Sequence, residues 1–366
     1  MTSFPYEKRL AALQKRLKER GIAAAVILDR ANTRYLSGFA GTYSYIVITQ
    51  DEARFITDFR YWERAKAEVR NFEIVRQDRN AAATLRAVFE TLAPRTIGFE
   101  EEISWAQVRF LKSCARRAKW IPISDSVREL RLIKDAAEVR AVARAAAIAD
   151  KVFAQICTEL RPGLSERQIS RRLRDLLEQA GAEGESFPNI VAGGPHSAQP
   201  HAHPTDRRIR KGEILTLDFG AIVDGYCSDM TRTVFVGRPP AGSAKSAELK
   251  KIYGIVLEAQ ERALAAVAPG RTTIEVDAAA RDVIRDAGYA ECFGHGTGHG
   301  VGLEIHEPPR LAPGHESVLR EGMIVTIEPG IYVAGTGGVR IEDLVLVTAR
   351  GARRLSKAPK NLTVLS

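Results

Sequence analysis

The chain has 366 residues, of which 45% are hydrophobic and 27% are charged, and its formal net charge is +9 at pH 7. This length allows two domains with their own cores, and the composition is that of an ordinary globular protein. No apolar run reaches the roughly 20 residues that span a bilayer, and the charged N-terminus has no apolar signal-peptide core. We therefore expect a cytoplasmic protein with no membrane partner.

Charge distribution and cysteine spacing argue against two further classes of site. The positive net charge is compatible with nucleic-acid binding, but the basic residues alternate with acids and the densest basic run is only DRRIRK, at 206–211. We therefore expect no nucleic-acid partner. The four cysteines lie far apart with no CxxC pair, which argues against a disulfide framework and a thiolate zinc site.

The first part of the chain, to about residue 125, alternates helix and strand patterns at the spacing of an α/β domain. It contains no cluster of residues that would carry out catalysis, and we interpret it as a scaffold domain over residues 1–128. Helices are expected near 6–20, from Tyr61, and over 82–92 and 105–114. Strands are expected at 23–28, 45–49, 53–57, 72–75 and 96–99.

A helix start marks the beginning of the second domain, which we place at residues 129–366. Asp135 followed by Glu138 is an N-cap with its capping-box partner, and it opens a long alanine-rich helix. Ser165 caps a second helix, which is expected to stop at Gly181.

The segment that contains this second helix is repeated later in the chain. Residues 162–181 align with 269–288 without a gap and with six identities in twenty positions, and a long helix pattern precedes each copy. A strand pattern follows each copy, GEILTLDFG at 212–220 and GMIVTIEPG at 322–330. The alignment places Asp218 over Glu328. If the two halves are related by a pseudo-twofold axis, each half brings one carboxylate to the same central site.

A second acid follows each of these strands on a returning strand, Asp229 in the first half and Glu342 in the second. Four clustered carboxylates cannot all remain ionised at low dielectric without cations. The sequence therefore predicts a metal site between the two halves.

The histidines supply a further type of ligand. Six of the seven lie between residues 196 and 306, and the segment GHGTGHGVGLEIHE holds three of them. The glycines of this segment argue against a zincin helix, HExxH is absent, and no helix start follows that would suggest a phosphate loop. They fit a strand whose backbone approaches a crowded site. Four acids and one imidazole suit two Mn, Co, Fe or Zn ions.

With these motifs in place, the chain resembles the pita-bread metallopeptidases, specifically the Xaa-Pro aminopeptidases and prolidases. The resemblance covers essentially the whole chain and rests on LTLDFGAIVDGYCSDMTRT, HGTGHGVGLEIHE, IVTIEPGIY and GGVRIED, which occur in the family's order. It implies an α+β protein: a C-terminal pita-bread domain built from the pseudo-twofold repeat, preceded by a smaller creatinase N-terminal-like α/β domain.

The resemblance also implies an activity, the hydrolysis of Xaa-Pro peptide bonds by a metal-bridging hydroxide. The substrate would be a peptide or dipeptide with proline at the second position, and the cofactor two divalent ions, Mn or Co before Zn or Fe. The implied metal ligands are Asp218, Asp229, His299, Glu328 and Glu342.

Further roles carry over by matching position. Glu328 would shuttle a proton to the leaving nitrogen, and His201 and His306 would contact the substrate and the transition state. His295 would line the site near the leaving group, and Arg310 would bind the substrate's C-terminal carboxylate. The resemblance also implies a homodimer, and we expect segment 33–45 to reach a neighbouring subunit. Finally, Arg340 is predicted to orient Glu342.

Three other interpretations are weighed against this one. Methionine aminopeptidases share the five ligands, but such chains are generally shorter and lack this N-terminal domain. A creatinase-like amidinohydrolase would not need the full ligand set, and a pita-bread module that binds protein or RNA would need none of it. All five ligand positions are filled, which favours the Xaa-Pro hydrolase.

Overall fold

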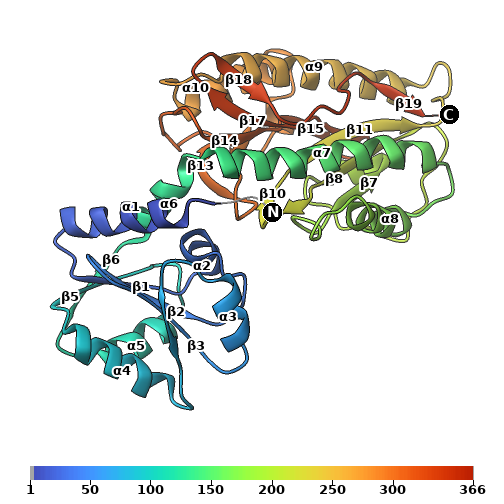
Figure 1. The fold of residues 1–366 in the computed structure, drawn as a ribbon. Helices are drawn as coiled ribbons and strands as arrows, with labels where there is room; N and C mark the ends of the chain where they lie inside the picture. The colour runs from blue at the N-terminus through green and yellow to red at the C-terminus, as the bar shows by residue number, and fades with distance from the viewer. Residues whose placement is uncertain (1–3, 366) are drawn as a thin grey trace. The chain divides into compact units, whose positions relative to one another are not determined.

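The computed structural model describes residues 4–365, and the chain divides after Arg131 into two compact units, each described here by itself (Figure 1). Among the described residues, no helix combines the length and the apolar character that crossing a bilayer requires.

The N-terminal unit is built on a six-stranded mixed sheet with the order β4-β3-β2-β1-β5-β6. The pairs β1–β2 and β2–β3 are antiparallel. The pairs β3–β4, β1–β5 and β5–β6 are parallel. The strands are β1 (Ala24–Ile27), β2 (Tyr45–Thr49), β3 (Ala53–Thr57), β4 (Glu73–Arg76), β5 (Thr96–Phe99) and β6 (Lys119–Pro122).

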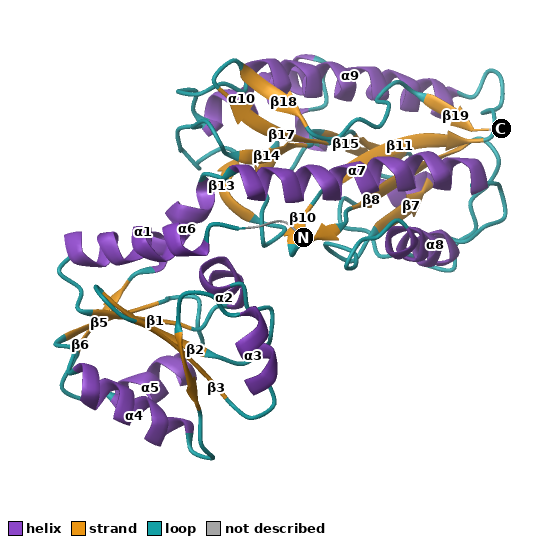
Figure 2. Ribbon diagram, viewed as in Figure 1, coloured by secondary structure: helices purple, strands orange, loops and turns teal. Residues whose placement is uncertain are grey.

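Helices flank this sheet (Figure 2). The helices are α1 (Tyr6–Glu19), α2 (Arg30–Ser37), α3 (Trp62–Glu68), α4 (Ala81–Leu92), α5 (Trp105–Cys114) and α6 (Ser124–Leu132). Leu85 of α4 and Leu111 of α5 share one buried cluster with Val26 and Val47 of the sheet, because their apolar residues recur at helical spacing on one side. Helix α5 begins where the sequence predicts it, at a capping box formed by Ser104.

The described part of the C-terminal unit contains two larger sheets, whose strands are mostly antiparallel, and two short hairpins. The first sheet, ordered β19-β11-β8-β7, consists of β7 (Ile190–Gly193), β8 (Glu213–Phe219), β11 (Met230–Val236) and β19 (Thr363–Leu365). The second, ordered β13-β12-β14-β17-β18, consists of β12 (Gly298–Gly300), β13 (Glu307–Leu311), β14 (Ile324–Ile327), β17 (Asp343–Thr348) and β18 (Gly351–Arg354). The hairpins pair β9 (Ile222–Val223) with β10 (Tyr226–Cys227), and β15 (Gly330–Val333) with β16 (Gly337–Arg340).

Two pairs of helices cover these sheets. They are α7 (Ala136–Glu159), α8 (Glu166–Gln179), α9 (Ala244–Ala266) and α10 (Thr273–Asp286), with short 3-10 helices η1 (Gly194–Ala198) and η2 (Ala290–Cys292). Helices α8 and α10 both have 14 residues, and both open with a capping box, at Ser165 and at Thr272. After further elements, each half has a strand, a hairpin and a returning strand: β8, β9–β10 and β11 in the first half, and β14, β15–β16 and β17 in the second. The predicted repeat is confirmed in this order of elements.

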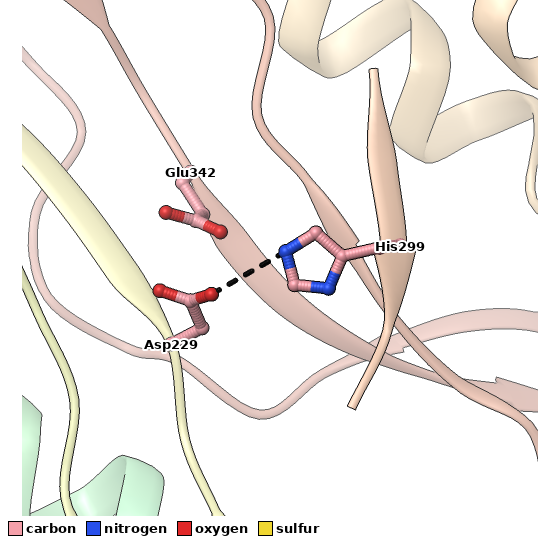
Figure 3. Close-up of side chains that lie close together, drawn as sticks. All are labelled: Asp229, His299 and Glu342. Atoms are coloured by element: carbon pink, nitrogen blue, oxygen red, sulfur yellow. Dashed lines mark ion pairs between the residues drawn. The ribbon is translucent and has the colours of Figure 1, made fainter. Parts of the chain in front are cut away.

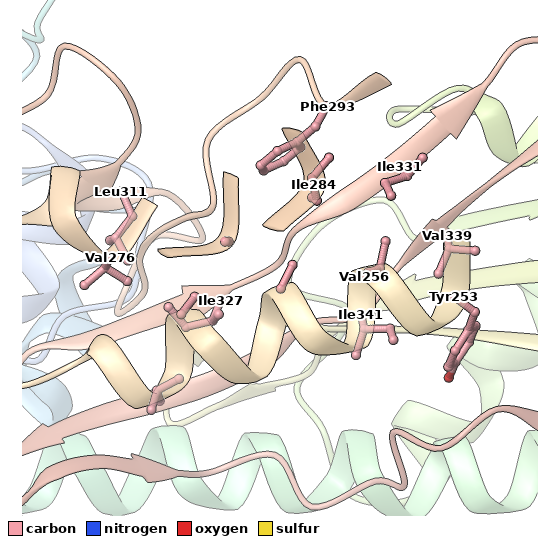
Figure 4. Packing of buried hydrophobic residues seen from close by; sticks show 14 of the residues in the cluster. Tyr253, Val256, Val276, Ile284, Phe293, Leu311, Ile327, Ile331, Val339 and Ile341 are labelled. Atoms are coloured by element: carbon pink, nitrogen blue, oxygen red, sulfur yellow. The ribbon is translucent and has the colours of Figure 1, made fainter. Parts of the chain in front are cut away.

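Each half has its own apolar core. In the second half, Val256 of α9 and Val276 of α10 pack in one buried cluster with Ile327 and Val339 of the strands (Figure 4). In the first half, α7 and α8 pack in the same way against β8 and β11. Each fully buried aliphatic side chain stabilises the fold by about 1.5–3 kcal/mol. These cores fix the strands whose ends carry the acidic residues.

Candidate metal centre and active site

The four predicted acids lie at equivalent points of the two antiparallel strand pairs. Asp218 lies near the end of β8, and Asp229 directly precedes β11, the strand that pairs with β8. Glu328 directly follows β14, and Glu342 directly precedes β17, the strand that pairs with β14. Because the two strands of each pair run antiparallel, the end of one strand lies beside the beginning of the next, so each pair places its two acids together.

His299 reaches the acids because the strand that carries it is rich in glycine. A Cβ atom on Gly298 would collide with the carbonyl oxygen of Thr326 on β14, and one on Gly300 would collide with a backbone carbonyl of β13. The absence of both side chains lets β12 lie close between its neighbours. As a result, Nε2 of His299 lies 3.3 Å from Oε1 of Glu328. The prediction of a close-packed strand, and of no zincin helix, is confirmed.

Three of the predicted ligands form a group that could hold one cation. Ligand atoms of Asp229, His299 and Glu342 lie within 4.8 Å of one another. Figure 3 shows the two carboxylates and the imidazole close together on three different segments of the chain, and the distance from His299 Nε2 to Asp229 Oδ2 is 3.6 Å. Asp218 and Glu328 are not members of this group of three, but they line the same cavity.

The electrostatics of the cluster favour a cation. Burial raises the pKa of Asp229 well above its ordinary value, and the neighbouring charge of Glu342 raises it further. Burial and the charge of Glu328 likewise raise the pKa of Glu342, and burial raises the pKa of Glu328. These carboxyl groups therefore resist ionising together at neutral pH unless positive charge is supplied.

Three carboxylate oxygens show where that charge would be accepted. Oδ1 of Asp218, Oδ1 of Asp229 and Oε1 of Glu342 are buried, and none accepts a hydrogen bond from the residues that the structure describes. A buried carboxylate oxygen without a partner is costly, so such atoms are rare unless an ion or water completes them. Hard oxygen donors with one imidazole suit a divalent cation. The residues present therefore fit the metal that the sequence implies.

Arg340 supports the cluster differently from the prediction. Its Nη2 donates to Oδ2 of Asp218 at 2.6 Å, and its Nε donates to Oγ1 of Thr231 at 3.0 Å. The Thr231 hydroxyl in turn donates to Oε2 of Glu342 at 2.7 Å. Arg340 thus holds Asp218 of β8 directly, and its side-chain hydrogen bonds among the described residues reach Glu342 through Thr231.

All nine site residues predicted from the sequence line one cavity of about 800 Å³, which lies wholly within the C-terminal unit. The other lining groups include the apolar side chains of Phe187, Ile190 and Pro308. The nine are His201, Asp218, Asp229, His295, His299, His306, Arg310, Glu328 and Glu342.

Tyr332 belongs to this site and was missed in the sequence. Its hydroxyl lies 2.9 Å from Nε2 of His295 and accepts a hydrogen bond from Arg340 at 2.8 Å. Gly338 lies opposite Tyr332 in the β15–β16 hairpin, and a Cβ there would come within 2.7 Å of the tyrosine ring. The glycine pair in GGVRIED was the signal that a large side chain needs room opposite it.

Helix α10 fixes the segment that carries His295. Arg281 donates to the backbone carbonyls of Phe293, at 3.1 Å, and His295, at 2.7 Å, and it is ion-paired with Asp277 at 2.7 Å. Asp277 also accepts hydrogen bonds from the backbone and hydroxyl of Thr297. Burial lowers the pKa of His295, so the ring is expected to be neutral at pH 7.

Both units match families of known proteins. The model of Metallopeptidase family M24 matches residues 140–349, more than half of the chain, and that of the Creatinase/Prolidase N-terminal domain matches residues 9–133. The chain is 38% identical to the Xaa-Pro dipeptidase of Pyrococcus furiosus, over 97% of this chain and 99% of that protein.

Solved structures agree with these matches. The Xaa-Pro dipeptidase from Bacillus anthracis superposes with a TM-score of 0.93 at 41% identity and covers 98% of this chain and 100% of its own. The X-Pro aminopeptidase from Thermotoga maritima gives a TM-score of 0.87 at 37% identity, with 95% and 99% covered. The predicted pita-bread fold and family are confirmed. The chain therefore belongs to metallopeptidase family M24, and it is a metallo-exopeptidase with a creatinase/prolidase N-terminal domain.

Proposed function

We propose that this protein hydrolyses Xaa-Pro peptide bonds with the help of two divalent metal ions. The observation that carries the proposal is the cluster of buried acids from two matching strand pairs, three of whose oxygens have no hydrogen-bond donor among the described residues. The names of its full-length relatives, Xaa-Pro dipeptidase and X-Pro aminopeptidase, support the choice of substrate. The ligands would be Asp218, Asp229, His299, Glu328 and Glu342, and the ions Mn or Co before Zn or Fe.

When bound, two such ions supply Lewis acidity, which lowers the pKa of water toward about 7 and polarises a carbonyl. The chain itself must then move a proton. Glu328 is suited to this role because its carboxylate lies within the cavity and Oε1 accepts a hydrogen bond from Thr326 at 3.1 Å. It would take a proton from the attacking water and pass it to the leaving proline nitrogen.

Histidines complete the chemistry on the substrate side of the cavity. Burial lowers the pKa of His306, so its neutral ring can offer one N–H donor to the substrate carbonyl as negative charge develops on the oxygen. His201 lines the same cavity and would contact the substrate, and His295 would lie near the leaving group.

Proline suits this site for a chemical reason. An Xaa-Pro bond is a tertiary amide, so it has no N–H group that a peptidase could use to position it. A site that holds the substrate by its N-terminus and its carbonyl does not need that group. The apolar residues that line the cavity, Phe187, Ile190 and Pro308, offer contacts for the ring.

A substrate panel tests the proposal. Protein loaded with Mn is expected to release proline from Xaa-Pro dipeptides, or the first residue from longer Xaa-Pro peptides, and to leave matched Xaa-Ala peptides largely intact. Hydrolysis is followed by quantifying the free amino acids. A metal-loaded protein that cleaves none of the proline peptides would favour a creatinase-like amidinohydrolase or a protein- or RNA-binding module instead.

Arg310 is proposed to set the preferred substrate length. It lines the cavity from β13, where its guanidinium could bind the C-terminal carboxylate of a dipeptide. Arg310→Ala is therefore expected to lower kcat/KM for Xaa-Pro dipeptides by about 10-fold to 100-fold, as expected for the loss of a hydrogen bond to a charged group. Xaa-Pro tripeptides should be affected much less, since their carboxylate lies farther along the chain. Equal losses on both substrates would remove this role.

The homodimer and the cytoplasmic location remain predictions. Residues 33–37 of the segment expected to reach a neighbouring subunit lie in helix α2, which ends at Gly38 with a left-handed φ of 84°. Only the rest of that segment, up to the start of β2 at Tyr45, is loop. Light scattering would establish the oligomeric state directly.

A further inference from the structure

A buried ion pair lies beside the proposed active site and has no part in the chemistry described above. Nζ of Lys134 lies 3.1 Å from Oε2 of Glu307, and only 1% and 3% of the two side chains is exposed. Lys134 is the third residue of the C-terminal unit, which begins at Leu132. Glu307 lines the cavity and directly follows His306 in the chain. The pair therefore links the first residues of this unit to the segment that carries a proposed catalytic histidine.

The carboxylate of Glu307 lies inside the loop that precedes it. Its Oε1 accepts a hydrogen bond from the backbone N–H of Glu304 at 3.2 Å. A Cβ atom on Gly302 would lie only 2.5 Å from Oε2 of Glu307, so the glycine leaves the space that the carboxylate fills. The loop is also held by its own backbone, where the N–H of Cys227 donates to the carbonyl of Gly302 at 2.8 Å. Residues 302–306 are thus arranged around one buried negative charge.

The backbone of Lys134, whose ammonium group pairs with the Glu307 carboxylate, is held in place by its neighbours. Its backbone N–H donates to the carbonyl of Gly322 at 2.9 Å, and the next residue, Asp135, is the N-cap of the 24-residue helix α7. Leu132 and Ile133 pack against the apolar core of the second half. The ammonium group is therefore presented by a segment that is anchored on both sides.

His306 depends on this arrangement because its ring has little else to orient it. The ring lies edge-on to His299, with 4.4 Å between the ring centroids, and makes no hydrogen bond to the residues that the structure describes. Its direction is consequently set by the backbone around Glu307. A buried ion pair adds little net stability compared with an apolar pair of the same shape, but removing one of its two charges is strongly destabilising, so the pair can impose one geometry.

We propose that the Lys134–Glu307 ion pair holds His306 in its working position in the cavity, so that Lys134 is a positioning residue for the reaction. The inference rests on the proposed function only in giving His306 a role in hydrolysis. The placement of the ring by the ion pair can be tested without any substrate.

Kinetics provide the first test. Lys134→Met is expected to lower kcat for an Xaa-Pro peptide by about 10-fold to 100-fold, the range in which small misplacements act, with KM and bound metal unchanged. Lys134→Arg, which keeps the charge, should recover most of the activity. Arg172→Met serves as the control, since it breaks a partly exposed ion pair with Glu159 away from the cavity and should leave kcat unchanged.

A double-mutant cycle separates positioning from stability. In a His306→Ala background, Lys134→Met should cause no further loss of kcat, since the residue it positions is gone. A loss of the same size in both backgrounds would overturn the proposal. If Lys134→Met does not fold, Lys134→Met/Glu307→Gln removes both charges: the proposal expects recovered thermal stability with kcat still low, and full recovery of kcat would contradict it.

A crystal structure of the Lys134→Met/Glu307→Gln variant gives a readout that needs no activity. The His306 ring is expected to rotate or shift away from His299, while the acidic cluster keeps its arrangement. An unmoved His306 would overturn the inference. If the wild-type protein cleaved none of the Xaa-Pro peptides, the proposed function would be refuted. The crystal structure would still test whether the ion pair positions His306.

Discussion

Replacing Glu328 with glutamine is expected to lower kcat for Xaa-Pro hydrolysis by about 10³-fold or more, since catalytic proton transfer alone contributes about 10²-fold to 10⁴-fold. The amide keeps the size of the side chain and one oxygen atom, but near neutral pH it neither takes up nor releases a proton, and it has no negative charge. The loss should therefore exceed that of any substitution that only weakens substrate binding. Steady-state kinetics with saturating Mn would measure it.

A matched control for this variant lies on the same strand pair. Glu321 is exposed and precedes β14, and Glu321→Gln removes one negative charge from the same region without touching the cavity. Its kcat should equal that of the unmodified protein. If Glu328→Gln kept its activity within about tenfold, the carboxylate would not be the proton carrier, and the mechanism proposed here would be wrong.

Removal of the metal is expected to abolish hydrolysis and to destabilise the fold. Burial and mutual repulsion raise the pKa of Asp229, Glu328 and Glu342, so the folded state without cations holds carboxylates that resist ionisation. A cation present at about one hundred times its Kd would stabilise the folded state by about 2.7 kcal/mol. For a chain of 366 residues, that corresponds to a Tm higher by roughly 3–4 °C.

The pH dependence of the chelated protein follows from the same groups. A carboxyl group with a raised pKa binds its proton more tightly in the folded state than in the unfolded chain. Its contribution to the free energy of unfolding is therefore fully present below about pH 4 and is lost as the pH rises through the raised pKa. With EDTA, Tm should fall more steeply than with Mn as the pH rises above about 4. Identical pH profiles with and without metal would contradict this account.

Much of the fold could be predicted because its determinants are local. Strands β2 and β3 lie at the predicted residues, and the capping boxes at Asp135 and Ser165 open helices where the sequence indicates them. The repeat could be recognised because each copy has the same order of cap, helix and strand. That order also explains why the acidic residues could be identified from the sequence and are found lining one cavity.

Other elements lacked such a local signal. Helix α2 has only eight residues, and α6 covers a segment that was interpreted as a domain boundary. Strand β13 contains Pro308 and Pro309, which normally argue against a strand. It is tolerated because β13 lies at the edge of its sheet, where only one side of the strand needs hydrogen bonds.

The parts of the site that were missed depend on contacts between distant residues. Lys134 and Glu307 are 173 positions apart, and no periodicity or motif connects them. Arg340 was expected to orient Glu342, its neighbour in sequence, yet it binds Asp218 across the strands at 2.6 Å. Sequence patterns were enough to select residues that line one cavity, whereas the pairing of charges required the three-dimensional structure.

We propose that acids from both halves of the repeat, together with His299, bind a pair of divalent ions that hydrolysis requires. The most direct measurement is a titration of chelated protein with Mn, in which bound ions and released proline are quantified at each step. We expect about two ions per chain at saturation, activity that rises as they bind, and fewer bound ions in Asp229→Asn. A chain that binds no ion, or an ion count unchanged by Asp229→Asn, would contradict the claim.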